Sequence, residues 1–420
     1  MSAGPRTPAL PSSDGQPSDG DLLASWHPGG FLMERAGAGV VAGGEGRRLE
    51  VPAGARQAVR AAEAAEAALA ELDVDGAVVV GALPFQGDAP ARLLVPERAR
   101  VTSIAGRDVD LGAPGARGAA GPPPDGAARA QGEPPISPLR WTPVPPVAAY
   151  AAAVAEAIAR IRSGELEKVV LARSLVAPNP GLDIRALLAE LRRRDPGCHL
   201  FAAPVDGGGT FLGATPETLV RREGDRVLSL PHAGTVARSP DPDLDRWEAE
   251  ILLRAAKGLH EHALVVEAVA DALSPLCTEL SVDSEPHLTA TATVWHLTTS
   301  VRGRLRSPAP SALALAAALH PTPAVCGVPQ AAARELIARL EPHARGLFAG
   351  LVGWMDSRGD GEWAVSLRCA LITPEAVRVD AGAGIIAESQ PDIEAAETEA
   401  KFRTVLDALE ARVAASGAPA

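Results

Sequence analysis

The sequence predicts an α+β fold with mostly antiparallel sheets, and three observations support this prediction. Strand-like runs follow one another in groups, with helices between the groups, so the strict alternation typical of a parallel sheet is missing. Hydrophobic residues make up 46% of the 420 residues, which is enough for a sizeable core. Aromatic residues make up only 3%, so that core must consist mostly of leucine, valine, isoleucine and alanine.

The N-terminal third of the chain combines two polar segments with a region of short strands. Residues 1–20 are rich in Ser, Pro, Gly and Asp, which predicts a disordered segment. Residues 21–111 contain three strand-like runs and a helical stretch at 55–72, and we expect them to form an N-terminal α+β part of the same fold. Proline and glycine dominate residues 112–138, which indicates a flexible loop.

The pattern changes after residue 145, and residues 145–412 are expected to form one region of longer elements. Predicted helices span 147–163, 183–194 and 243–273, with two short ones around 320–340 and a last one that ends near 413. The predicted strands are EKVVLARSL, HLFAAPV, GTFLGA, ETLVRREGDRVLSL, LTATATVWHLTTSVRGRL, LFAGLVGWMDS, EWAVSLRCALI and AVRVDAGAGII.

The composition also limits the partners and the compartment. The formal net charge is −12 and the chain has no basic tract, which argues against nucleic-acid binding. The four cysteines have no paired spacing, as is usual in a reducing cytoplasm and in a chain without a zinc site. The N-terminus lacks the apolar core of a secretory signal, and no apolar run is long enough to span a bilayer. We therefore expect a soluble cytoplasmic protein with no membrane partner.

Glu394, Glu397 and Lys401 are the most informative residues, because positions three and four apart share one face of a helix. Two carboxylates on one face repel each other unless positive charge lies between them. Their oxygen atoms suit a hard divalent cation such as Mg²⁺. The alternative interpretation is a solvated helix face with an ordinary ion pair between Glu397 and Lys401.

Two further residues have the properties of a base and an acid. Lys168 begins an otherwise apolar strand, and loss of hydration lowers the pKa of a lysine toward neutrality. Glu217 follows Pro216 in GATPETL, next to an apolar strand, where a carboxyl group can have a raised pKa. The alternatives are an edge lysine that reaches solvent and an ordinary turn glutamate.

The run GLHEHALVV lies within the predicted helix 243–273 and invites a zinc interpretation. His260 and His262 are two positions apart, so they point to different sides of the helix, and the HExxH spacing is absent. The sequence therefore argues against zinc at this point. Glu261 remains available as a carboxylate ligand, with a solvent-facing position as the alternative.

One arginine and two glycines are candidates for anion binding. Arg368 lies in the predicted strand EWAVSLRCALI, where alternation places it on one face with Ser366 and Ala370. Such an arginine suits a bidentate grip on a carboxylate, and a salt bridge across the sheet is the alternative. Gly382 and Gly384 match part of a dinucleotide fingerprint, but a strand continues where the fingerprint requires a helix. Bare glycines can still let backbone amides approach an anion.

Ten motifs occur in the order found in the chorismate-utilising enzymes, and among these the isochorismate synthases resemble the chain most. The motifs are EKVVLAR, GATPETL, PHAGT, KGLHEH, TVWHL, HPTPAVCG, LFAGLVGW, GEWAVSLRCA, AGAGI and ExxETxxK. They cover approximately residues 145–410. The resemblance implies a large antiparallel β-sandwich surrounded by helices, an active site deep between the sheets, and a dependence on Mg²⁺.

The same resemblance implies a role for each candidate residue in the isomerisation of chorismate. Lys168 would activate water for attack at C2, and Glu217 would protonate the departing C4 hydroxyl. Arg368 and the backbone of Gly382 and Gly384 would hold the enolpyruvyl carboxylate. The carboxylates that would hold Mg²⁺ are Glu261, Glu394 and Glu397. The other residues of the substrate pocket would be Gly234, Thr235, His296, Ala324, Val325 and Lys401.

Lys168 also separates this chain from other branches of the family. Anthranilate synthases carry a glutamine at this position and use a glutaminase subunit. Because this chain has a lysine there, no glutaminase subunit is expected. Aminodeoxychorismate synthases keep the lysine but use it as a nucleophile. A salicylate synthase, which goes on to eliminate pyruvate, stays open as the alternative, and a chorismate sensor without turnover is a third hypothesis. The resemblance further implies a monomer that supplies siderophore or menaquinone biosynthesis. Gly258 departs from the family, whose members usually carry an acidic residue there, which puts the affinity for Mg²⁺ in doubt.

Overall fold

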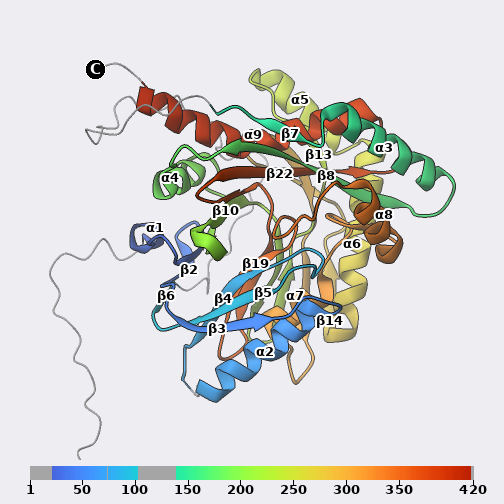
Figure 1. The fold of residues 1–420 in the computed structure, drawn as a ribbon. Coiled ribbons are helices and arrows are strands. Elements are labelled where there is room, and N and C mark those ends of the chain that lie inside the picture. Colours follow the sequence, from blue (N-terminus) through green and yellow to red (C-terminus); the bar gives the residue numbers. More distant parts are fainter. Residues whose placement is uncertain (1–20, 73, 103–138, 418–420) are drawn as a thin grey trace, which may run out of the picture.

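The computed structural model describes residues 21–72, 74–102 and 139–417 (Figure 1). The predicted disordered segment 1–20 and the predicted loop 112–138 both lie outside the described residues. The described part of the chain is an α+β structure with two large sheets and one small one. Every strand pairing in it is antiparallel, as the sequence predicts.

The first large sheet contains the strands on which most candidate residues of the C-terminal half lie. In spatial order its strands are β18 (Gly327–Val328), β8 (Lys168–Pro178), β22 (Ala376–Ile385), β21 (Cys369–Ile372), β10 (Thr210–Thr215), β9 (His199–Pro204), β1 (Phe31–Arg35), β2 (Ala38–Ala42) and β6 (Ala99–Thr102). β7 (Thr142–Val144) pairs with the far end of β8. The N-terminal strands thus belong to the same sheet as the C-terminal ones.

The second large sheet and the small sheet complete the β structure. The strands of the second sheet are β14 (Cys277–Val282), β17 (Val301–Leu305), β12 (Arg226–Ser229), β11 (Thr218–Glu223), β20 (Gly361–Val365), β19 (Leu351–Asp356), β4 (Val78–Leu83), β5 (Ala91–Pro96) and β3 (Gly46–Val51). The small sheet consists of β13 (His232–Ala237), β16 (Val294–Thr298) and β15 (His287–Ala290).

Helices cover the outer sides of both large sheets. They are α1 (Leu22–Ser25), α2 (Gln57–Leu72), α3 (Val147–Arg162), α4 (Ile184–Arg194), α5 (Pro242–Leu252), α6 (Ala256–Leu273), α7 (Ala312–Leu319), α8 (Gln330–Leu340) and α9 (Pro391–Gly417), with 3₁₀ turns at Asp206–Gly208 and Ser274–Leu276. Figure 1 shows α3 and α9 over β8 and β22, and α2 with α7 at the opposite end of the molecule. Each of the described helices is too short or too polar to cross a membrane.

Strand alternation divides the apolar side chains of the first sheet between two cores. Phe201 and Phe211 face the second sheet and belong to a core that also contains Trp363 of β20. Their neighbours Leu200 and Leu212 face the other way, into a second core beneath α4 and α9. The first core therefore lies between the two large sheets, which gives the sandwich that the family resemblance implies.

Two elements that the sequence predicts to be continuous are each divided in the structure. The predicted helix 243–273 is divided into α5 and α6, because Ala255 adopts an extended conformation and the helix restarts at the next residue. Gly258 lies against the side chains of Leu252, on the other side of this break, and Leu297 of β16. The predicted strand EWAVSLRCALI is also divided, because β20 and β21 belong to different large sheets.

Candidate active site

Lys168 and Glu261 meet in the interior at one end of the first sheet. Lys168 is the first residue of β8 and is fully buried, with its Nζ atom 3.0 Å from Glu261 Oε1 on α6. Gly384 on β22 lies against both side chains, and a Cβ atom at this position would collide with Glu261 Oε1. Burial raises the pKa of the Glu261 carboxyl, but the charge and hydrogen bond of Lys168, together with the charges of Lys401 and Lys257, outweigh burial, so the net pKa is lowered. The glycine therefore makes room for an ion pair between a buried lysine and an ionised glutamate.

Glu217 occupies the turn between β10 and β11 and is almost completely buried. Its Oε1 atom has no hydrogen-bond partner among the described residues. Burial raises the pKa of this carboxyl to about 8, although the positive charges of Lys168, Arg368 and Lys401 act in the opposite direction. Lys168, Arg368 and Lys401 therefore lie near enough to Glu217 for their charges to act on it. Near neutral pH the Glu217 carboxyl therefore carries a proton that it can donate.

The first turns of α9 supply two more carboxylates beside α6. Glu394 is fully buried, and its Oε1 atom accepts a hydrogen bond of 2.6 Å from Lys257 Nζ on α6. Glu397 accepts one of 2.6 Å from Lys401, whose Nζ atom also donates to the carbonyl oxygen of Gly382 at 2.8 Å. The helix face predicted from the sequence is thus directed into the protein and away from solvent.

The three carboxylates predicted to hold a metal lie close enough to influence one another. Burial raises the pKa of Glu397, and the negative charges of Glu261 and Glu394 raise it further, against the effect of Lys401. Within the described ranges, no three acidic, histidine or cysteine side chains are arranged to hold a metal ion. Each carboxylate contacts a lysine instead.

A hydrogen-bonded chain of three predicted pocket residues links the two sides of the site. Arg368 Nη2 donates to His296 Nε2 at 2.8 Å, and His296 Nδ1 lies 3.0 Å from Thr235 Oγ1. Burial and the charge of Arg368 lower the pKa of His296 well below its ordinary value, so the imidazole is neutral. Since Nε2 must accept from the guanidinium, Nδ1 carries the proton and donates it to Thr235.

Arg368 does not lie on a strand, so the predicted alternation with Ser366 and Ala370 is wrong. It lies between β20 and β21 with a φ of +49°, and its carbonyl oxygen accepts a hydrogen bond from the amide of Ala214. This left-handed conformation turns the chain from one large sheet into the other. Arg368 is buried, and its Nε atom has no partner in the described part of the chain.

The remaining predicted pocket residues belong to backbone features beside the site. Gly234 has a φ of +72° in a β-bulge of β13, next to Gly258. Val325 is buried in the core between the sheets, and Ala324 precedes it in the loop after α7. The next residue of this loop, Cys326, accepts a hydrogen bond of 2.7 Å from the amide of Val170 on β8.

Sequence reasoning missed Lys257 and a buried ion pair between Glu341 and Arg345. Arg345 donates to the carbonyl oxygens of Val170 and Val325 at 2.8 Å and 2.7 Å, and Glu341 accepts from the amide of Ala172 at 2.9 Å. The pair therefore holds the strand of Lys168 against the loop of Val325. No pattern in the sequence indicates the long-range contact between Glu341, Arg345 and β8. The rarity of lysine in the chain could have drawn attention to Lys257.

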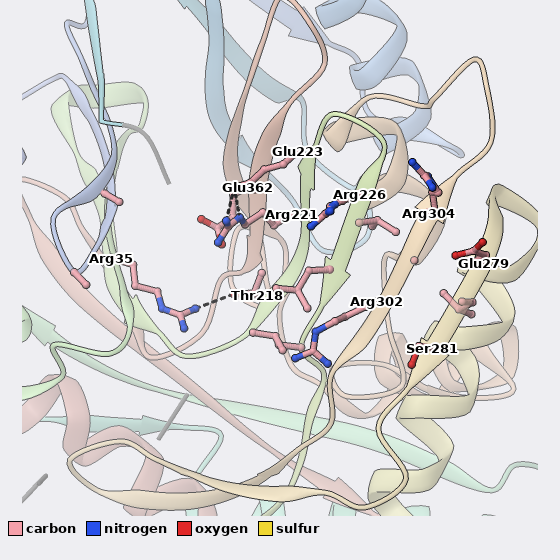
Figure 2. Close-up of a pocket in the computed structure, with 17 residues that line it drawn as sticks. Arg35, Thr218, Arg221, Glu223, Arg226, Glu279, Ser281, Arg302, Arg304 and Glu362 are labelled. Carbon is pink, nitrogen blue, oxygen red and sulfur yellow. Dashed lines mark hydrogen bonds and ion pairs between the residues drawn. The ribbon is translucent and has the colours of Figure 1, made fainter. Parts of the chain in front are cut away.

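A cavity of about 570 Å³ lies on another side of the molecule, and none of the predicted site residues is among the described residues that line it (Figure 2). It opens between the β1–β2 turn and strands of the second sheet. Figure 2 shows Arg35 directed at Thr218 on one side, with Arg226, Arg302 and Arg304 on the other. Thr218 directly follows Glu217, but the candidate chemistry described above does not depend on this cavity.

Comparison with known proteins shows the family of this chain. Residues 128–410 match the family model described as "Chorismate binding enzyme". The chain is 43% identical to the putative isochorismate synthase MenF of Mycobacterium tuberculosis, over 79% of this chain and 86% of that protein. It is 38% identical to the isochorismate synthase EntC of Escherichia coli, over 79% of this chain and 80% of that protein. A crystal structure of the putative 2,3-dihydroxybenzoate-specific isochorismate synthase DhbC from Bacillus anthracis superposes with a TM-score of 0.80 and 39% identity, covering 93% of this chain and 98% of that one. This chain therefore belongs to the family of chorismate-binding enzymes.

Proposed function

We propose that this protein is an isochorismate synthase, which converts chorismate into isochorismate. The observation that carries the proposal is the pair of buried titratable groups, Lys168 and Glu217, which lie close enough for the charge of Lys168 to act on Glu217. A protein that only binds chorismate has no need of a proton donor held in its neutral form. The names of the relatives described above favour the same reaction.

The proposed reaction adds water at C2 of the ring and removes the hydroxyl group from C4. Lys168 first releases its ammonium proton to solvent, and the neutral amine then takes a proton from the attacking water while the new C2–O bond forms. The ring double bonds shift, the C4–O bond breaks, and Glu217 gives its proton to the departing hydroxyl, which leaves as water. The proton then returns from Lys168 to Glu217 through solvent, so atoms and charge balance. General acid–base assistance of this kind contributes ~10²–10⁴ in rate for each group.

Mg²⁺ is part of the proposal, because the donor atoms of the three carboxylates suit this ion. Glu261, Glu394 and Glu397 offer only oxygen atoms, which hard cations prefer, and the mutual repulsion noted above favours a cation between them. Glu394 Oε2 is buried and has no partner within the described residues. When bound, Mg²⁺ would supply positive charge for the ring carboxylate of chorismate.

The second carboxylate of chorismate, on the enolpyruvyl arm, is assigned to Arg368. The unpartnered Nε atom gives this guanidinium a free donor, and His296 and Thr235 fix its orientation. We assign the backbone of Gly382 and Gly384 to the same carboxylate. The other pocket residues proposed are Gly234, Ala324, Val325 and Lys401.

Product analysis tests this proposal directly. Purified protein with chorismate and Mg²⁺ is expected to form isochorismate, detected by chromatography, and EDTA is expected to abolish turnover. A coupled lactate dehydrogenase assay detects pyruvate, which a salicylate synthase would release and an isochorismate synthase would not. Chorismate that binds but stays unchanged would contradict the proposed activity. We propose that the product enters siderophore or menaquinone biosynthesis, and that the enzyme acts as a monomer in the cytoplasm without a glutaminase subunit.

A further inference from the structure

Lysine is very rare in this chain, and this rarity makes each lysine informative. Only three of the 40 Lys and Arg residues are lysines, at positions 168, 257 and 401. Arginine supplies the positive charge everywhere else, including the described surface ion pairs. Lysine and arginine are not interchangeable, because an ammonium group is compact and strongly hydrated and a guanidinium group is a broad planar fork. A lysine at these positions therefore indicates a need for the ammonium group itself.

All three lysines pair with the three carboxylates assigned to the metal. Lys168 lies 3.0 Å from Glu261, Lys257 lies 2.6 Å from Glu394, and Lys401 lies 2.6 Å from Glu397. Lys168 and Lys401 already have roles in the proposed reaction. Lys257 has none, although it belongs to the same cluster of charges.

The pair formed by Lys257 and Glu394 is unlike the other two in its exposure. The side chain of Lys257 is 35% exposed, whereas those of Lys168 and Lys401 are 0% and 12% exposed. Glu394 is 0% exposed, and only one of its oxygen atoms has a partner among the described residues. The ammonium group of Lys257 can therefore withdraw into water, while the carboxylate cannot.

Among the described residues, Lys257 makes one side-chain hydrogen bond, at the start of α6, and the charges of Glu261 and Glu397 also act on it. Its Nζ atom donates to Glu394 Oε1, whereas Lys401 Nζ also donates to the carbonyl oxygen of Gly382. The following residue is Gly258, which presents no side chain of its own to Glu394.

We propose that Lys257 is an exchangeable counter-ion, which neutralises Glu394 until a divalent cation takes its place. The ammonium group and the cation then compete for the same carboxylate, so Lys257 sets the affinity of the site for Mg²⁺. This inference depends on the proposed metal site. It explains how a fully buried carboxylate is tolerated before the cation arrives, since an unpaired buried charge would be strongly destabilising.

Calorimetric titration with Mg²⁺ tests the competition without any measurement of turnover. Lys257→Met keeps the length of the side chain but removes the charge, and it is expected to bind Mg²⁺ at least about tenfold more tightly than the wild type, since a charge-assisted hydrogen bond no longer has to be broken. Lys257→Arg keeps the charge and is expected to bind Mg²⁺ no more tightly than the wild type. Arg403→Met is the matched control, because it removes one positive charge from an exposed ion pair on α9 and should leave the affinity unchanged.

The rarity of lysine allows a second test on the unaltered protein. An acylating amine reagent followed by peptide mass spectrometry reports on three lysines and the terminal amino group alone. Saturation with Mg²⁺ is expected to increase the modification of Lys257, while Lys168 and Lys401 stay weakly modified. Sodium chloride at the same ionic strength is the control and should have no such effect.

The possible failures can be told apart. If the wild type takes up Mg²⁺ but Lys257→Met binds it no more tightly, or if Mg²⁺ leaves Lys257 equally or less reactive, the competition is refuted and the metal site stands. If the wild type takes up no Mg²⁺ at all, both the metal site and the competition are refuted. Formation of isochorismate in the product assay remains a separate measure of the proposed reaction.

Discussion

The pKa of Glu217 predicts an alkaline limit to catalysis. Burial raises this pKa to about 8, so at pH 7 about nine-tenths of the molecules carry the proton that the leaving hydroxyl group requires. Above pH 8 the protonated fraction falls about tenfold for each pH unit. We therefore expect kcat/KM to decline above an apparent pKa of about 8, measured as isochorismate formed at saturating Mg²⁺ between about pH 6 and pH 10.

Glu217→Gln removes the acidic proton of the side chain but keeps its size and shape. The glutamine is neutral and similar in size to the protonated glutamic acid, but it cannot donate an acidic proton. At pH 7 kcat is expected to fall by a factor of ~10²–10⁴, with a small change in KM, and the alkaline decline should disappear from the residual activity. A wild-type profile that stays flat to pH 10, or a variant with near-normal kcat, would refute the assignment of the acid.

The same pKa has a consequence for stability that serves as an independent check. The pKa in the folded protein lies above the ordinary value of 4.5, so the native state binds the proton more tightly than the unfolded chain. Stability therefore decreases as pH rises from about 4.5 to about 8, where the carboxyl group becomes charged in the interior. Denaturant unfolding should show Glu217→Gln gaining stability over the wild type at pH 9 but not at pH 4, where both side chains are neutral.

Three other substitutions test the remaining parts of the site. Lys168→Ala should abolish isochorismate formation while the circular dichroism spectrum stays native; near-normal activity would overturn the base assignment. Arg368→Lys should raise KM for chorismate at least about tenfold with a smaller effect on kcat, because a lysine lacks the fork that grips a carboxylate; an unchanged KM would remove Arg368 from substrate binding. Arg345→Met should destabilise the protein by roughly 3–5 kcal/mol in denaturant unfolding, because Glu341 is left buried and unpaired, and a loss below about 1 kcal/mol would contradict this.

Features that depend on local pattern were predictable from the sequence. The strands that contain Lys168 and Gly384 follow from apolar runs, and α4 follows from its helical period and from the capping by Asp183 at its start. The common face of Glu394 and Glu397 follows from helix geometry alone. That this face is directed inward depends on the packing of α9 against β22, which no local pattern reveals.

Features that depend on long-range packing were not predictable. No helix-breaking residue separates α5 from α6, so the extended conformation of Ala255 that divides them has no signal in the sequence. The positive φ of Arg368 could not be predicted from the sequence either, because arginine rarely adopts this conformation and nothing nearby in the sequence indicates a turn. In both cases the tertiary structure overrides the local preference.

The passage of the chain from β20 to β21 couples the anion site to the thickness of the sandwich. Arg368 lies at this passage, one strand length from Trp363, which fills the layer between the sheets. Any change in the spacing of the sheets shifts the guanidinium relative to the lysine on β8. With the role proposed for Arg368, a substitution of Trp363 that changes the spacing of the sheets would therefore also change the affinity for chorismate.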